Sequence, residues 1–221
     1  MAAVARRHEV RDMIVLVAQH NSHEYSNLMD QMFRLRARVF RDRLGWNVHV
    51  TDGKERDKYD DEAPVYLIYA DDEAQEVKGS LRLLPTTGPT LLADFFSDTL
   101  PTAAYLSAPT IWECTRFCLD DTILGSGQRE KQLLTSAVLI AALGDVALKA
   151  GIESIIGNFD PTMLRLYRRI GCEVEVLGST RRYGRPVYLG LFDISEPILS
   201  KVKERLKEAQ AAVMNRGELV A

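Results

Sequence analysis

The sequence has few cysteines, no excess of positive charge and no long apolar run. Its three cysteines, Cys114, Cys118 and Cys172, have no metal-binding spacing, which predicts reduced, buried thiols and no metal site. A formal net charge of −3 provides no general basic field for nucleic acid. No apolar stretch approaches the roughly 20 residues that a membrane-spanning helix needs. The sequence therefore predicts no nucleic-acid binding, no membrane span and no metal dependence.

What is present is typical of a globular protein. The 221 residues are 46% hydrophobic and 27% charged, enough to form a core within one domain. We expect residues 1–12 to be a loose N-terminal extension and residues 13–221 to form the domain. The basic residues of that extension precede no apolar segment of signal-peptide length, which predicts a cytoplasmic location.

Strand-like and helix-like segments alternate along the chain. Strand patterns occupy 13–18, 65–70, 77–84, 110–119, 152–158, 172–178 and 186–194, and helical patterns occupy 24–43, 128–149, 160–170 and 195–213. A short polar turn joins 65–70 to 77–84, which predicts a hairpin. The alternation predicts an α/β fold whose sheet has mixed strand directions and carries helices on its faces.

The predicted helix 24–43 contains an arginine in an apolar row. Met29, Phe33, Arg36 and Phe40 recur at steps of four, three and four residues. A buried guanidinium needs a partner, because an unpaired buried charge is costly. The row leaves two alternatives for Arg36, a structural salt bridge or a bond to the carboxylate of a ligand.

Two further segments suggest ligand contacts. KERDKYDD (54–61) either faces water, as charge runs usually do, or holds a cationic ligand through Glu55, Asp57 and Asp60. Before the helix 128–149, Gly125 and Gly127 form a loop with Ser126 as N-cap. Backbone N–H groups there can receive a phosphate, although this pattern alone is weak.

In order and spacing, the motifs from Arg36–Trp46 through KERDKYDD, GSLRLLPTTGP and LADFF to IWECTRF resemble the LuxI-type acyl-homoserine lactone synthases, the autoinducer synthases of bacterial quorum sensing. The resemblance covers at least residues 13–120. It implies a GNAT-like single domain, a mixed, mostly antiparallel twisted sheet flanked by helices. It also implies acyl transfer from acyl-carrier protein, or from acyl-CoA, to the amine of S-adenosylmethionine. Lactone formation then releases methylthioadenosine, and S-adenosylmethionine is a substrate, so no cofactor is implied.

The resemblance also assigns residues. It maps the family's invariant positions onto Arg36, Phe40, Trp46, Asp57, Asp60, Arg82, Phe96, Glu113 and Arg116, with Glu55 as a further acidic position. We expect three of these residues to be catalytic: Glu113 as the general base, Glu55 as the second candidate for that role, and Arg116. The other seven are expected to bind S-adenosylmethionine. Aromatic faces attract a sulfonium, arginines bind a carboxylate, and carboxylates accept from an ammonium group. For Trp46, plain core packing is the alternative.

The strand 110–119 poses a geometric problem. Strict alternation places Glu113 and Arg116 on opposite faces of the strand. It places Cys114 and Cys118 on the same face as Arg116. Glu113 and Arg116 can line one site only if the strand is irregular. We therefore predict a β-bulge near Cys114–Thr115.

The acyl donor should meet two further regions. The segments 110–119, 128–149 and 153–158 are expected to line an apolar tunnel. Family members that make 3-oxo chains often carry a threonine in the last of these; here no hydroxyl lies between Ile155 and Asp160, which favours an unsubstituted or 3-hydroxy chain. An arginine-rich region predicts a docking surface for an acidic carrier protein, unless these residues are simply solvated: Arg165, Arg168, Arg169, Arg181 and Arg182.

Two other functions remain open from the sequence. A GNAT-type N-acyltransferase that uses acyl-CoA and another amine shares the fold and the tunnel. A non-catalytic module that binds acyl ligands leaves Glu113 and the acidic trio without a task. Identifying the product formed from S-adenosylmethionine distinguishes the synthase, the N-acyltransferase and the non-catalytic module.

Overall fold

Seven strands form one sheet in the chain that the computed structural model describes, residues 12–73, 75–100, 102–122 and 128–218. Their order is β1-β4-β5-β6-β7-β9-β8, and every neighbouring pair is antiparallel except β6 and β7, which are parallel. The bounds are Asp12–Val17 (β1), Val65–Asp71 (β4), Glu76–Pro85 (β5), Ile111–Leu119 (β6), Ser154–Phe159 (β7), Glu175–Thr180 (β8) and Val187–Asp193 (β9). The predicted hairpin is β4–β5.

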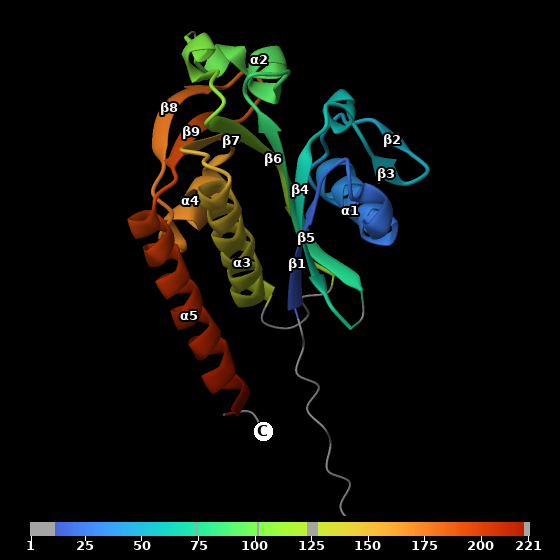
Figure 1. Cartoon of the computed structure of the whole chain (residues 1–221), viewed down its shortest axis with the longest axis vertical. Helices are drawn as coiled ribbons and strands as arrows, with labels where there is room; N and C mark the ends of the chain where they lie inside the picture. Colours follow the sequence, from blue (N-terminus) through green and yellow to red (C-terminus); the bar gives the residue numbers. More distant parts are fainter. Residues whose placement is uncertain (1–11, 74, 101, 123–127, 219–221) are drawn as a thin grey trace, which may run out of the picture.

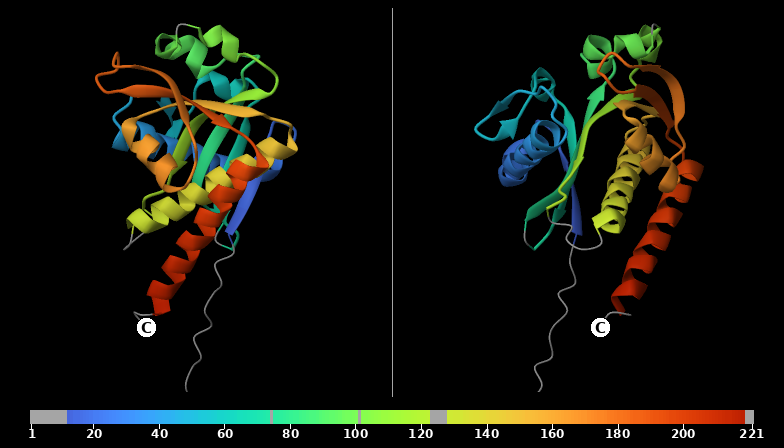
Figure 2. Two further views of the ribbon diagram at one scale, coloured as in Figure 1. Left: turned by 90° about the vertical axis from the view of Figure 1, so that its left-hand side faces the viewer. Right: turned by 180° about the vertical axis from the view of Figure 1, so that it is seen from behind.

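Helices cover both faces and one end of the sheet (Figures 1 and 2). The helix α1 (Ser26–Arg36) lies on one face, and α3 (Gln128–Lys149) and α5 (Glu196–Glu218) lie on the other. The short α2 (Leu91–Phe95) lies at one end, and α4 (Pro161–Arg169) follows β7. This arrangement confirms the predicted fold class, a mixed, mostly antiparallel sheet flanked by helices.

Shorter elements fill the connections. The two-residue strands β2 (Val50–Thr51) and β3 (Lys54–Glu55) pair with each other after α1. Single 3₁₀ turns occupy Ser22–Tyr25, Lys58–Asp61, Ser97–Thr99 and Ala103–Leu106. The segment between Trp46 and Asp61 therefore contains a small hairpin and a 3₁₀ turn.

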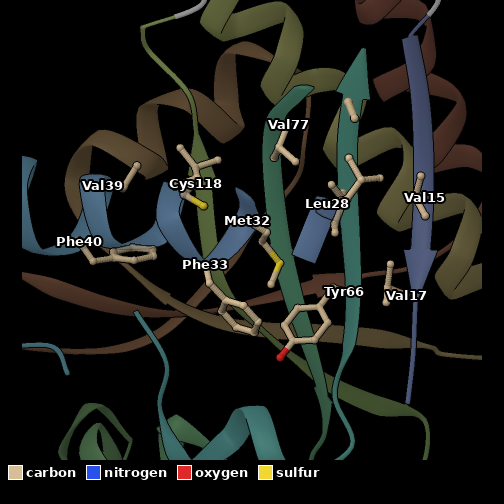
Figure 3. Close-up of a cluster of buried hydrophobic side chains, with 13 residues drawn as sticks. Val15, Val17, Leu28, Met32, Phe33, Val39, Phe40, Tyr66, Val77 and Cys118 are labelled. Atoms are coloured by element: carbon tan, nitrogen blue, oxygen red, sulfur yellow. The ribbon is translucent and has the colours of Figure 1, made fainter. Parts of the chain in front are cut away.

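Apolar side chains of α1 pack against the sheet in one buried cluster (Figure 3). Leu28, Met32 and Phe33 of α1 meet side chains of β1, β4, β5 and β6. Tyr66 of β4 lies at the edge of the cluster, and its hydroxyl donates to Asp60 over 2.7 Å. The apolar core therefore adjoins the charged segment 54–61.

The predicted helix 24–43 is not α-helical to its end. α1 stops at Arg36 and the chain continues as a π-helix over Ala37–Arg43. Gly45, with a φ of 66°, ends it, and the N–H of Trp46 donates to the carbonyl of Phe40 over 2.8 Å. Periodicity missed this wider turn because positions three and four residues apart stay on nearly the same face.

A β-bulge in β6 places Glu113 and Arg116 on the same face of the sheet. The register between β5 and β6 shifts between Ser80 and Arg82, whose partners on β6 are three residues apart. Arg116 lies in this stretch with a φ of 53°, in the left-handed region. The predicted bulge is therefore present, just beyond the predicted step Cys114–Thr115.

The bulge also separates two cysteines that alternation placed together. Cys118 packs in the cluster under α1, whereas Cys114 packs on the opposite face, near α3. The expectation of one shared face was therefore wrong. Cys118 is buried as predicted, but Cys114 and Cys172 are only partly buried.

One described helical segment, Glu130–Lys149 of α3, has the length and apolar content of a membrane-spanning helix. The expectation that no such segment exists was therefore wrong. In the fold this segment packs against the sheet, where Leu139 and Ala147 have no exposed surface.

Two of the predicted segments lie partly or wholly outside the residues that the structure describes. Residues 1–11 of the predicted extension lie outside the described residues, and Asp12 already belongs to β1. Gly125, Ser126 and Gly127, the predicted loop and N-cap before α3, also lie outside them.

Candidate active site

Three arginines and three carboxylates form one ionic network beside the bulge of β6. Its members are Arg36, Glu55, Asp57, Asp60, Arg82 and Arg116. All six were singled out from the sequence, and the fold brings them together from α1, β3, the turn Lys58–Asp61 and its N-cap, β5 and β6. With three charges of each sign, the network is formally neutral.

Arg36 ends α1 with its side chain 1% exposed. Its Nε donates to Glu55 over 2.5 Å, and its two terminal nitrogens donate to the two oxygens of Asp60 over 2.8 and 2.9 Å. A bidentate pair of this kind compensates the cost of burying both charges. Of the two alternatives for Arg36, the structure therefore shows the salt bridge.

Arg82, on β5, joins two acids. Its guanidinium donates to both oxygens of Asp57 over 2.5 and 3.0 Å and to Asp60 over 2.8 Å, and its Nε donates to Thr115 over 3.0 Å. Neither Thr115 nor Tyr66, which also donates to Asp60, was predicted. Tyr66 fits an ordinary buried strand, so only the tertiary contact reveals its polar role.

Asp60 and Arg36 stay ionised near neutral pH. Burial alone would raise the pKa of Asp60, but hydrogen bonds and charges from Arg36 and Arg82 outweigh it and hold the pKa well below its usual value. Burial also opposes the charge on Arg36, yet Asp60 and Glu55 raise its pKa. The charges of Asp60 and Arg36 therefore persist as a matched pair.

Two members form the accessible edge of the network. The side chain of Arg116 is 10% exposed and that of Asp57 is 18% exposed, whereas the other four are at most 1% exposed. Arg116 donates to Glu55 over 2.9 Å and lies 2.7 Å from Asp57. We call Arg116 and Asp57 the edge pair, since they can meet a ligand while the remaining four hold them.

Glu113 lies on the same face of β6 but binds a different partner. Its two carboxylate oxygens accept from the backbone N–H groups of Leu91 and Leu92 over 2.9 and 2.7 Å, at the start of α2. Burial raises the pKa of Glu113 to about 7, although these N–H groups and the charges of Arg82 and Arg116 oppose the shift. A carboxyl with this pKa can exchange a proton near neutral pH.

The predicted aromatic residues lie around this face. Phe40 stacks on Trp46 with ring centroids 5.1 Å apart, and Arg116 lies 5.3 Å from the centroid of Phe40. Trp46 is 40% exposed, which excludes the core-packing alternative. Phe96 follows α2 and contacts Tyr183 at 5.2 Å, edge to face.

The turn between β8 and β9 reaches toward these aromatics. The Tyr183 hydroxyl donates to the carbonyl of Phe95, and the Arg185 guanidinium lies 5.8 Å from the Trp46 ring centroid. This turn was not assigned to the site from sequence. No local pattern indicates it, because its partners lie far away along the chain.

An apolar cavity of about 60 Å³ lies on the opposite face of β6. The three predicted walls all contribute, through Cys114 and Phe117, through Ile140, Leu143 and Gly144, and through Ile155. Tyr167, Cys172 and side chains from β9 and α5 close the rest, which the sequence did not predict. β6 therefore has charged groups on one face and an apolar cavity on the other.

The five arginines of the predicted docking surface lie on two elements. Arg165, Arg168 and Arg169 are exposed on α4, whereas Arg181 and Arg182 are exposed in the turn after β8. Their closeness in sequence therefore does not make them one helical patch. The α4 group adjoins a polar cleft between α4 and α5, which Arg168 lines.

The fold is one shared by acyl-transferring enzymes. FeeM, an N-acyl amino acid synthase from uncultured soil microbes, superposes with a TM-score of 0.56 at 13% identity, over 84% of this chain and 92% of that chain, which shows the fold alone. The CoA-dependent acyl-homoserine lactone synthase BjaI, solved with SAM and isopentyl-CoA, is more similar. It gives a TM-score of 0.76 at 28% identity, over 89% of this chain and 90% of that one.

Sequence comparison agrees with this similarity. The acyl-homoserine-lactone synthase of Rhizobium etli is 44% identical over 167 residues, 75% of this chain and 77% of that relative. The sequence model of the autoinducer synthase family matches residues 19–202. The chain therefore belongs to the autoinducer synthase family, and the predicted family and enzyme class, an acyltransferase, are confirmed.

Proposed function

We propose that this enzyme transfers an acyl group from a thioester to the amine of S-adenosylmethionine and forms an acyl-homoserine lactone. The observation that carries the proposal is the division of β6. One face carries Glu113, the general-base candidate, and Arg116, which pairs with Asp57; the other face lines the apolar cavity. Two substrates of opposite character can thus approach one strand from two sides.

The charged face suits S-adenosylmethionine, which is a substrate here and not a cofactor. Arg116 is placed to bind the carboxylate, and Asp57 to accept from the ammonium group. The exposed Trp46, supported by Phe40, attracts the sulfonium, and Phe96 closes the α2 side. Arg36, Asp60 and Arg82 act indirectly, because they are buried and hold the edge pair.

The reaction then proceeds in two steps. Glu113 takes a proton from the amine, whose nitrogen attacks the thioester carbonyl; the carbon–sulfur bond of the donor breaks and its thiol leaves. The carboxylate oxygen next attacks the methylene beside the sulfonium, and methylthioadenosine leaves as the lactone closes. Glu55, bonded to two guanidiniums, is less suited than Glu113 to accept the proton.

The cavity suits the acyl chain. A volume of about 60 Å³ holds roughly four to six groups the size of a water molecule. Among the described residues that line it, Tyr167 and Ser195 are the ones that carry a hydroxyl. An unsubstituted or 3-hydroxy chain, as expected from the sequence, stays our proposal.

Filling the cavity at Cys172 should shorten the preferred acyl chain. Cys172 lines both this cavity and the polar cleft between α4 and α5, so it separates the two. Cys172→Phe is expected to lower kcat/KM for the longest accepted donor by roughly tenfold or more, because overpacking costs about 1–3 kcal/mol. Short donors should be unaffected.

The matched control is Cys118→Ala, a change in a cysteine that packs on the opposite side of the sheet. It should leave the ranking of donors unchanged. Product lengths are read by mass spectrometry after reaction with a series of donors. An unchanged ranking in Cys172→Phe would mean that the chain does not reach this wall.

For the donor we propose acyl-carrier protein or acyl-CoA, and charge reversal separates them. Arg168→Glu with Arg169→Glu is expected to raise the carrier-protein KM by roughly tenfold without changing S-adenosylmethionine binding, since complementary charge drives docking. The same acyl chain on coenzyme A serves as the matched donor. Arg181→Glu with Arg182→Glu tests the second group, and an unchanged KM removes the tested pair from the interface.

One assay tests the proposed function. The enzyme is incubated with S-adenosylmethionine and a panel of acyl donors, and methylthioadenosine and lactone are measured by mass spectrometry. An acylated product from a different amine would support the N-acyltransferase alternative, and binding without turnover would support a non-catalytic module. The cytoplasmic location stays a prediction.

A further inference from the structure

Asn158 of β7 has a buried polar atom without a partner. Within the described residues, its Oδ1 is the buried side-chain nitrogen or oxygen atom that lacks a hydrogen bond. Such atoms are rare in folded proteins, because leaving a polar group buried and unpaired is costly. An unpaired acceptor inside a binding site suggests a donor that arrives with the substrate.

The position of Asn158 in the sheet relates it to Glu113. Ile156 pairs in register with Glu113, and this is where the parallel pairing of β6 and β7 ends. Ile156 packs with Leu92 of α2, so alternation places Asn158 on the same face as Glu113, two residues further along β7. That face, and not the cavity face, is where the amine substrate is proposed to bind.

The direction of Oδ1 follows from the other half of the carboxamide. Nδ2 donates over 3.4 Å to the carbonyl of Tyr188, on the neighbouring strand β9, and over 3.4 Å to the hydroxyl of Thr99. The carboxamide is planar and its oxygen diverges from its nitrogen, so Oδ1 points away from β9. β6 lies on that side of β7.

We propose that Asn158 Oδ1 accepts a hydrogen bond from the reacting α-amino group of S-adenosylmethionine. This role rests on the proposed function and adds a substrate-positioning residue to it. An amide oxygen is too weak a base to remove the proton, so Asn158 orients the nitrogen while Glu113 receives the proton. Thr99 also donates to the carbonyl of Phe96, which links Asn158 to the proposed aromatic side of the pocket.

The test compares S-adenosylmethionine with a ligand that lacks its amino-acid part. Asn158→Leu keeps a similar volume and removes the acceptor; Asn158→Ala is the second variant should leucine disturb folding. We expect S-adenosylmethionine to bind roughly tenfold or more weakly to the variant, because a bond to a charged donor is lost. Methylthioadenosine lacks the amine together with the carboxylate and the sulfonium charge. Of the first two groups, only the amine can donate to Oδ1, so methylthioadenosine should bind with an unchanged Kd.

The outcomes separate this proposal from its basis. An equal loss for both ligands would assign Asn158 a structural role and overturn the proposal. A raised KM for the acyl donor with unchanged S-adenosylmethionine binding would place the missing donor on the acyl substrate and overturn it too. If the unmodified enzyme forms no lactone from any donor, the proposed function itself fails.

Discussion

Replacing Glu113 with glutamine is expected to lower kcat by roughly 10²–10⁴-fold, the usual contribution of a general base. Glutamine cannot take the amine's proton. Its NH₂ group also faces an N–H of Leu91 or Leu92, where the carboxylate now accepts two hydrogen bonds. Steady-state kinetics with S-adenosylmethionine and one acyl donor measure the loss.

The pH dependence of activity isolates the proton-transfer role. Since burial raises the pKa of Glu113 to about 7, the ionised, active form appears as the pH rises through about 7. kcat/KM of the unmodified enzyme should therefore increase across that pH. The glutamine variant should lose this step from its residual activity. If the variant keeps the same step, another group titrates and Glu113 only supports α2.

Stability should respond to pH in the opposite sense. A carboxyl whose pKa rises from 4.5 in the unfolded chain to about 7 binds its proton more tightly when folded. Its contribution is fully present below pH 4.5 and is lost as the pH rises toward 7. Glutamine stays neutral, so the variant should be less destabilised relative to the unmodified protein at pH 8 than at pH 5.

Replacing Asp60 with asparagine is expected to destabilise the fold by about 3–5 kcal/mol, because removing one member of a buried ion pair leaves uncompensated charge. Asp60 accepts from Arg36, Arg82 and Tyr66, and its side chain has no exposed surface. In the variant, the buried guanidinium of Arg36 keeps only Glu55 as an acidic partner, and that of Arg82 keeps only Asp57. Urea unfolding followed by circular dichroism measures the change.

The adjacent residue supplies the control. Asp61 has a side chain 78% exposed and pairs with Arg56 at the surface, so Asp61→Asn should cost about 0–1 kcal/mol. The pKa of Asp60 is lowered on folding, so its contribution exists above its unfolded pKa of 3.8 and falls as acid protonates it. The gap between the two variants should therefore shrink at low pH. Equal losses near neutral pH would contradict a structural role for the network.

The charged stretch 54–61 illustrates how far sequence reasoning extends. Alone, it fits a solvated loop, and Arg56, Lys58 and Asp61 do have mostly exposed side chains. The resemblance in motif order singled out Glu55, Asp57 and Asp60, and the fold gathers these three acids around Arg36 and Arg82. The sequence did not reveal that three arginines already match these acids, so that the edge pair alone retains accessible surface.

By itself, the sequence determined the elements, the family and the irregularity in β6. These depend on spacings of two to four residues and on motif order, which a linear chain records directly; the bulge followed because alternation separated Glu113 from Arg116. Only the tertiary structure decided the partner of Arg36, the division of the five arginines, and the surroundings of Asn158. Such contacts join residues that are distant in the sequence: Glu55, for example, accepts from Arg36, 19 positions away, and from Arg116, 61 positions away. They depend on how the strands and turns pack together, and no local periodicity encodes which distant acid will lie beside which base.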